Sequence, residues 1–101
     1  MGQYNQTRWF GIKPTVRIAE EPGKQVTITT SDTEILAVND SRTSFLLIVK
    51  GTVNVFVKFG TGATTACPEL EPRDVLFCDD FTGALHGITA SEDGRVDVFE
   101  V

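Results

Sequence analysis

The stretch FGTGATTA, residues 59–66, has glycines at a spacing that could hold a phosphate group. Gly60 and Gly62 follow an alternating run of valines, and a glycine-rich loop after a strand can bind phosphate through its backbone N–H groups. A dinucleotide-binding fingerprint needs a third glycine where this chain has Thr65, and a Walker-type loop needs a lysine that this loop does not contain. The sequence therefore predicts a turn here, and no cofactor is expected.

Other side chains with catalytic or metal-binding chemistry are sparse. His86 is the single histidine, which excludes a site built from several histidines, and its neighbours in ALHGI favour a structural position in a strand. Asp79, Asp80 and Thr82 could offer oxygens to Ca²⁺, but adjacent carboxylates in a loop point in different directions. No serine lies in the G-x-S-x-G context of a nucleophile elbow. We expect no catalytic residue, no metal site and no enzyme activity.

The two cysteines do not form a recognisable redox or zinc motif. Cys67 and Cys78 are separated by PELEPRDVLF, which fits neither a C-x-x-C pair nor a zinc ligand set with its histidines. Two free thiols in the core are the favoured interpretation. A disulfide between them is the alternative that the spacing leaves open.

Length and charge restrict the class of protein. A chain of 101 residues has the size of one domain. Its 14 acidic and 9 basic residues give a net charge of -5, and the basic residues are scattered, which argues against a nucleic-acid partner. No apolar stretch approaches the ~18 residues that a membrane span requires. We expect a soluble, unsecreted protein without a membrane partner.

Apolar residues alternate along the chain with a period of two, which is typical of half-buried strands. Residues 52–59 place Val53, Val55, Val57 and Phe59 on one face, and the segments 24–30 and 95–101 alternate in the same way. The continuous apolar run TSFLLIV, residues 43–49, predicts a central strand that is covered on both faces. Shorter strand candidates are PTVRIAEE at residues 14–21, EILAV at 34–38, VLFC at 75–78 and ALHGITA at 84–90.

Turn-forming residues separate these runs. The sequence predicts an Asx-type turn in NDSR, residues 39–42, a tight connection at Gly51, and a two-residue hairpin at Asp93–Gly94 with a positive φ at Gly94. No helical pattern is present to carry a crossover. The predicted fold is all-β: a single antiparallel β-sandwich or small β-barrel of about eight strands over residues 13–101, with an extended N-terminal arm over residues 1–12.

The arm is the first candidate for a binding surface. Tyr4, Arg8, Trp9 and Phe10 lie in an otherwise polar stretch without strand alternation. Aromatic residues and arginine are frequent anchors of protein interfaces. Folding of Trp9 and Phe10 back onto one end of the sandwich is an equally weighted alternative, and both hold if that end lies at a seam between subunits.

The segments 38–66 and 70–101 resemble a group of small virion proteins of tailed bacteriophages. In that group an Asn-x-x-Arg turn leads into an apolar strand, a second strand ends in Phe-Gly with an Ala-Thr loop, and a closing Val-x-Val strand follows. The residues that carry the resemblance are Asn39, Arg42, Leu46–Ile48, Val55, Val57, Phe59, Gly60, Ala63, Thr64, Gly83, Ala84 and Val96–Val98.

This resemblance implies a noncatalytic structural subunit, of the capsid decoration or cement type, on the exterior of the virion. Such proteins are made in the host cytoplasm, assemble as trimers and bridge subunits of the major capsid protein. Ala63 and Thr64 belong to a small, neutral segment suited to lying against another protein, and they join the arm residues as expected partner-binding positions.

Three alternatives remain open. A head-to-tail connector or tail accessory protein would use the same fold in a ring of another symmetry. A carbohydrate-binding β-sandwich module would use exposed aromatics such as Tyr4 and Trp9 near Asn5. A host-derived β-sandwich unrelated to bacteriophages is the third.

Overall fold

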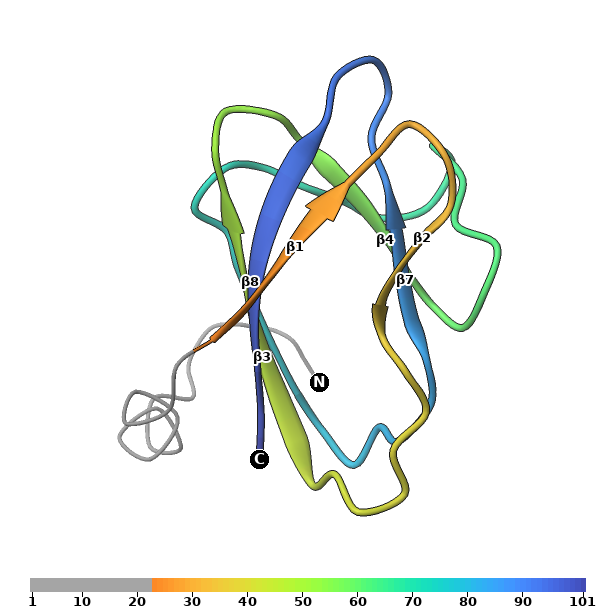
Figure 1. The fold of residues 1–101 in the computed structure, drawn as a ribbon, viewed down its shortest axis with the longest axis vertical. Coiled ribbons are helices and arrows are strands. Elements are labelled where there is room, and N and C mark those ends of the chain that lie inside the picture. The colour runs from red at the N-terminus through yellow and green to blue at the C-terminus, as the bar shows by residue number, and fades with distance from the viewer. Residues whose placement is uncertain (1–22) are drawn as a thin grey trace.

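The computed structural model describes residues 23–101, which form a β-sandwich of eight strands in two four-stranded antiparallel sheets (Figure 1). The predicted all-β class, the sandwich and the number of strands are confirmed. The expected arm at residues 1–12, the expected domain start at residue 13 and the predicted strand at 14–21 lie outside the described residues.

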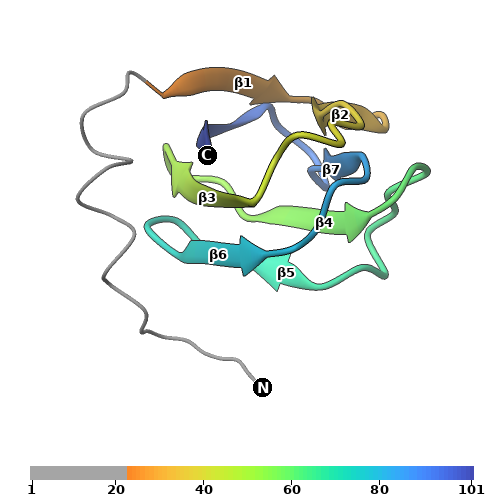
Figure 2. The same cartoon turned by 90° about the horizontal axis from the view of Figure 1, so that it is seen from below.

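The first sheet contains, in spatial order, β1 (Lys24–Ile28), β8 (Gly94–Glu100), β3 (Ser44–Lys50) and β6 (Val75–Asp79). The second contains β2 (Thr33–Leu36), β7 (Leu85–Ile88), β4 (Val55–Phe59) and β5 (Glu69–Leu70). Figure 2 shows the two layers from below, with β1, β3 and β6 from top to bottom on one side and β2, β7, β4 and β5 on the other.

The order of the strands is that of a jelly roll. The pairs β1–β8, β2–β7, β3–β6 and β4–β5 are those of one long folded hairpin, and rolling that hairpin adds the pairs β3–β8 and β4–β7. This wrapped, two-sheet arrangement occurs in viral capsid domains, lectins and cupins. Among residues 23–101 it leaves β1, β6, β2 and β5 as edge strands, so the domain is a sandwich and not a closed barrel.

The core forms where the alternating apolar residues of the two sheets face each other. Phe45, Leu47 and Val49 of β3 are fully buried, as the apolar run predicts for a central strand. They pack with the inward residues of the neighbouring strands, which are Ile28, Ile35, Leu36, Val55, Val57, Leu85, Val96 and Val98. Each such side chain stabilises the fold by roughly 1.5–3 kcal/mol relative to an exposed one.

Two details of the strand predictions differ in the structure. Phe59, expected on the buried face of β4, is 45% exposed because β4 ends there, and its ring packs edge-on against Phe81 with centroids 4.8 Å apart. The two-residue strand β5 lies in PELEPRD, where no strand is expected from the sequence, because so short a pairing leaves no alternation to detect.

Several turn predictions are confirmed. The Ser41 N–H donates to Asn39 Oδ1 at 3.0 Å, which is the predicted Asx turn. Gly51, Gly60 and Gly62 have φ values of 79°, 132° and 80°, so the two glycines of FGTGATTA turn the chain after β4.

The hairpin prediction at Asp93–Gly94 is wrong. Gly94 has no positive φ but pairs with Ile28 inside β8, and β7 and β8 lie in different sheets. A Cβ atom at Gly94 would lie 3.0 Å from Thr89 Cγ2 and 3.2 Å from Val55 Cγ2. Glycine is therefore needed at this position for close packing between the sheets and not for turn geometry.

Candidate interaction surface

Of the six predicted partner-binding residues, the structure describes only two, and these two differ in their exposure to solvent. Tyr4, Arg8, Trp9 and Phe10 lie outside the described residues. Thr64 is exposed, whereas Ala63 is only 4% exposed, so its methyl group lies inside the molecule and not on a flat outer surface. Of the two loop positions, only Thr64 is exposed to solvent.

The backbone of the loop at residues 59–66 binds a negatively charged group, which is the carboxylate of Asp32 in the same chain. The Ala63 N–H donates to Asp32 Oδ1 at 2.7 Å and the Gly62 N–H to Asp32 Oδ2 at 3.4 Å. The hydrogen bond from Ala63, together with one from His86 at 2.9 Å, lowers the pKa of Asp32 against the opposing effect of desolvation. Asp32 thus ties the β1–β2 connection to this loop.

His86 therefore has the structural role that the sequence favours. Its side chain is 12% exposed and its Nδ1 atom contacts both oxygens of Asp32. The sequence gives no signal for this partner, because Asp32 and His86 are 54 positions apart.

Arg42, one of the residues behind the resemblance, has a fully buried side chain and connects three segments. Its Nη1 donates to the carbonyls of Phe81 (2.7 Å) and Gly83 (3.2 Å), and its Nη2 donates to the Ala37 carbonyl (2.7 Å). Its Nε donates to Glu100 Oε1 at 2.8 Å. Arg42 is thus a structural residue that joins the β2–β3 and β6–β7 connections to the end of β8.

The carboxylate of Glu100, which accepts the hydrogen bond from Arg42 Nε, has a pKa below its ordinary value. Burial raises the pKa of Glu100, but hydrogen bonds from Arg42 and Asn39 outweigh burial and leave this pKa below its ordinary value. The charged form of Glu100 is therefore the one that the fold stabilises.

Both cysteines are free in the described part of the chain, as the favoured interpretation predicts. Cys78 packs against the core, and desolvation, with Asp79 and Asp80 beside it, raises the pKa of its thiol. Cys67 is half-buried beside Thr64, whose N–H points to its sulfur at 3.4 Å.

The four edges of the sandwich differ in how they are protected against pairing with another chain. Within residues 23–101, β5 has two residues, β2 carries an irregularity in register between Glu34 and Leu36, and β1 begins with Lys24. Short strands, bulges and lysine are the usual means of protecting an edge. β6 has only the charged Asp79 at its end, and Val75–Cys78 before it are four consecutive uncharged residues in regular pairing with β3.

Beside this edge, one part of the outer face of the first sheet is apolar, although the charged residues Asp97, which pairs with Ile48, and Arg95, which pairs with Lys50, lie on the same face. Phe45 and Leu47 of β3 face the core, so Leu46 and Ile48 face outward by alternation. Directly paired residues share a face, which places the apolar partners of these two residues on the same outer surface. Leu46 pairs with Phe77 of β6 and Phe99 of β8, and Ile48 pairs with Val75 of β6.

We call these five side chains, Leu46, Ile48, Val75, Phe77 and Phe99, the β6 surface. Val75 is 57% exposed, Ile48, Phe77 and Phe99 are half-buried, and Leu46 is only 7% exposed. Gly23 lies directly against the Phe99 ring, so the chain itself covers part of this surface. The solvated face of an antiparallel sheet normally carries polar residues, and an apolar patch there marks an interaction site. The uninterrupted apolar run of residues 43–49 predicts that both faces of this strand are buried. It does not predict which face is buried within the domain and which would be buried by another chain.

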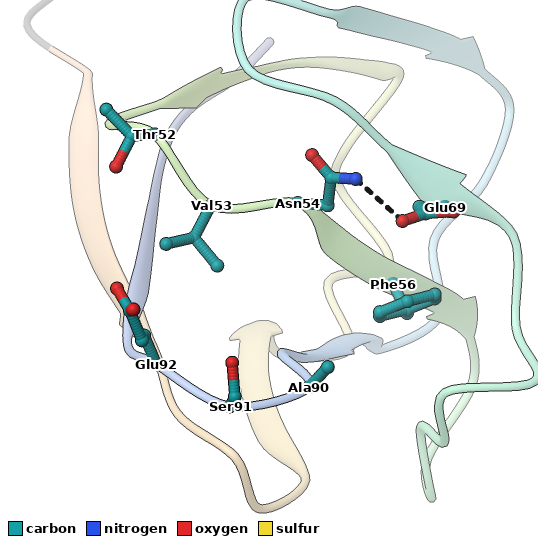
Figure 3. Close-up of a pocket in the computed structure, with 8 residues that line it drawn as sticks. All are labelled: Thr52, Val53, Asn54, Phe56, Glu69, Ala90, Ser91 and Glu92. Carbon is teal, nitrogen blue, oxygen red and sulfur yellow. Dashed lines mark hydrogen bonds between the residues drawn. The ribbon is translucent and has the colours of Figure 1, made fainter.

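A hollow of about 440 Å³ lies on the other sheet (Figure 3). The β3–β4 connection, the outward side chains of β4 and β5, and the β7–β8 connection surround it. Asn54 Nδ2 donates to Glu69 Oε2 at 2.7 Å across one side. Its lining is mostly polar, in contrast to the β6 surface.

No protein-family model, curated protein or solved structure matches the chain. Among residues 23–101 there is no group of three metal-ligating side chains, including the Asp79–Thr82 segment considered for Ca²⁺. No helix capable of crossing a membrane occurs in that range either. The β6 surface and the hollow are therefore the two candidate sites that the described residues offer.

Proposed function

We propose that this protein is a noncatalytic structural subunit of a bacteriophage virion, of the decoration type, which binds the outside of the head and bridges subunits of the major capsid protein. The observation that carries this proposal is the β6 surface. Within residues 23–101, an apolar patch next to an edge strand with little protection is suited to contact with another protein chain. The jelly-roll order, which viral capsid domains share, is compatible with this role.

The contact would combine two stabilising effects. Val75 and Phe77 are already partly covered in the isolated domain, so covering the remainder contributes about half of the roughly 1.5–3 kcal/mol that a fully exposed side chain would give. Pairing of the β6 backbone with another strand satisfies N–H and C=O groups along the edge, at about 0.5–1.5 kcal/mol for each hydrogen bond. Association costs about 4–15 kcal/mol in lost translational and rotational freedom, so the contact needs both effects to be stable.

The contact that we favour joins neighbouring copies into a trimer. β6 and β1 are the opposite edges of the same sheet, so β6 of one copy against β1 of the next is a head-to-tail contact, which gives a ring when the rotation between copies is one third of a turn. Asp79 and Asp80 lie at one end of β6, whereas β1 begins with Lys24, and this difference in charge favours contact between unlike edges.

Contact with the major capsid protein is assigned to the arm. Tyr4, Arg8, Trp9 and Phe10 have the composition of interface anchors and lie outside the described residues, so this assignment rests on the sequence. Thr64 adds an exposed polar position on the domain. A protein that lacks residues 2–10 should fold and form trimers but should no longer sediment with capsids.

Substitution of Val75 by lysine tests the trimer. Val75→Lys introduces a charge into the β6 surface at a position that is already 57% exposed, so the isolated fold should tolerate it. We expect each contact to weaken by at least about tenfold, which corresponds to about 1.4 kcal/mol. Light scattering after size-exclusion chromatography should then report monomers in place of trimers.

Val38→Lys is the matched control, because Val38 is a 65% exposed valine in the β2–β3 connection and outside the β6 surface. This variant should remain trimeric. A wild-type protein that is strictly monomeric both free and on capsids, or a Val75→Lys protein that stays trimeric, would contradict the role of the β6 surface. Copy number in purified particles separates the alternatives, since a decoration protein covers the head and a connector forms one ring.

A further inference from the structure

The hollow on the second sheet is lined largely by polar side chains, and the proposed decoration role assigns no function to them. Figure 3 shows side chains from three separate segments directed around one depression that is open to solvent. Its lining consists of Thr52, Val53, Asn54, Phe56, Glu69, Ala90, Ser91 and Glu92. Most of these residues carry a hydroxyl, amide or carboxylate group, so the hollow is suited to a ligand that forms several hydrogen bonds.

The charge of the lining selects against anions. Glu69 and Glu92 are both carboxylates, and no lysine, arginine or histidine is among the residues that line the hollow. A phosphate, sulfate or carboxylate ligand would be repelled and would find no cation to pair with. Two carboxylates without a third ligand also fall short of a metal site. The lining is therefore compatible with ligands that donate hydrogen bonds and carry no negative charge, and the aromatic ring of Phe56 and the amide of Asn54 favour a neutral one within this class.

Asn54 and Glu69 form a pair that fits neighbouring hydroxyl groups. Asn54 Nδ2 donates to Glu69 Oε2 at 2.7 Å, which fixes the two planar groups relative to each other. This leaves Asn54 Oδ1 and Glu69 Oε1 as acceptors and the second amide N–H of Asn54 as a donor. Two adjacent hydroxyls of a sugar ring both donate and accept, so a vicinal diol matches this set.

Phe56 supplies an apolar surface at the same place. It faces outward from β4, since Val55 and Val57 face the core, and it pairs directly with Glu69 of β5 and Ile88 of β7. Its ring is half-buried and therefore held by its neighbours. The face of an aromatic ring carries negative charge density and attracts the slightly positive C–H groups on the apolar side of a sugar.

From this geometry we infer that the hollow is a binding site for a neutral saccharide, with Phe56 under the sugar ring and Asn54 and Glu69 on its hydroxyl groups. Thr52 and Ser91 supply further hydroxyl contacts from the two flanking connections. An open hollow accepts a residue within a longer glycan chain. The site lies on the second sheet and the β6 surface lies on the first, so the inference does not depend on the trimer or on the decoration role.

The test uses the full-length protein on an array of oligosaccharides that contains neutral glucose, galactose and mannose chains together with sialylated and sulfated ones. The best neutral ligand is then titrated calorimetrically into the wild type and into Phe56→Ala and Glu69→Ala. We expect each substitution to weaken binding at least tenfold. Phe59→Ala is the matched control, because Phe59 lies on the same strand, is 45% exposed and does not line the hollow.

Binding of a neutral glycan that is lost in Phe56→Ala and kept in Phe59→Ala supports the inference, provided that circular dichroism shows all variants folded. Three results overturn it: binding to no neutral glycan, binding that survives both Phe56→Ala and Glu69→Ala, or binding restricted to the sialylated and sulfated chains. If Phe56→Ala fails to fold, Glu69→Ala decides alone, since Glu69 is exposed.

Discussion

Replacing Arg42 by lysine is the most informative single perturbation of this fold. The guanidinium donates in several directions at once: to the carbonyls of Phe81 and Ala37 at 2.7 Å each, to that of Gly83 at 3.2 Å, and to Glu100 at 2.8 Å. Lysine keeps the charge but has one nitrogen, which cannot reach acceptors on opposite sides of the side chain. At least two buried acceptors would lose their donor.

A hydrogen bond from a charged group contributes about 1.5–3 kcal/mol, so the loss of two predicts a decrease of about 3–6 kcal/mol in the free energy of unfolding. Domains of this size are stable by about 5–15 kcal/mol, so Arg42→Lys should lower the urea midpoint greatly. Far-UV circular dichroism in urea measures this change.

The control for this experiment is Arg95→Lys, because the Arg95 side chain is 49% exposed and lies 3.9 Å from Asp97. Its effect should stay below about 0.5 kcal/mol. A loss of less than about 1 kcal/mol in Arg42→Lys, with an unchanged urea slope, would refute the view that this arginine holds the three segments together.

Two further predictions concern packing and pH. Gly94→Ala should destabilise the domain by about 1–3 kcal/mol in urea unfolding, since its Cβ would lie 3.0 Å from Thr89 Cγ2 inside the sandwich, and an unchanged midpoint would contradict this steric explanation. Because the pKa of Glu100 is lower in the folded protein than its ordinary 4.5, its charged form stabilises the fold above that pH, and this contribution is lost as pH falls through the folded value. Thermal melting should therefore show a steeper loss of stability below about pH 4.5 in the wild type than in Glu100→Gln, and equal slopes would argue against this coupling.

The two candidate sites use different physical features of the same sandwich. The β6 surface is apolar and borders a free backbone edge, which suits a protein partner. The hollow beside Asn54 and Glu69 is polar and anionic, which suits a neutral hydroxylated ligand. Because they lie on opposite sheets, a subunit that is bound through the first could still present the second to solvent.

The sequence by itself determined most of the segments that become strands and several of the residues that turn the chain, but not β5 or the conformation of Gly94. Alternation is a local property, so Val55 and Val57 of β4 are assigned to the core from spacing alone. The sharp turn at Gly60 and Gly62 follows from local chemistry as well. The single histidine excludes a multi-histidine metal site without any knowledge of the fold.

The tertiary structure decided every feature that depends on residues far apart in the chain. Strand order is one of these features, because the pairing of β3 with both β6 and β8 has no local signature. This order places β6 at an edge of the sheet among residues 23–101. Asp32 holds the glycine loop from about thirty positions away, and Arg42 reaches Glu100 across 58. The role of Gly94 changed from turn to close packing for the same reason: its neighbours Val55 and Thr89 come from the opposite sheet and its border, which the local sequence does not record.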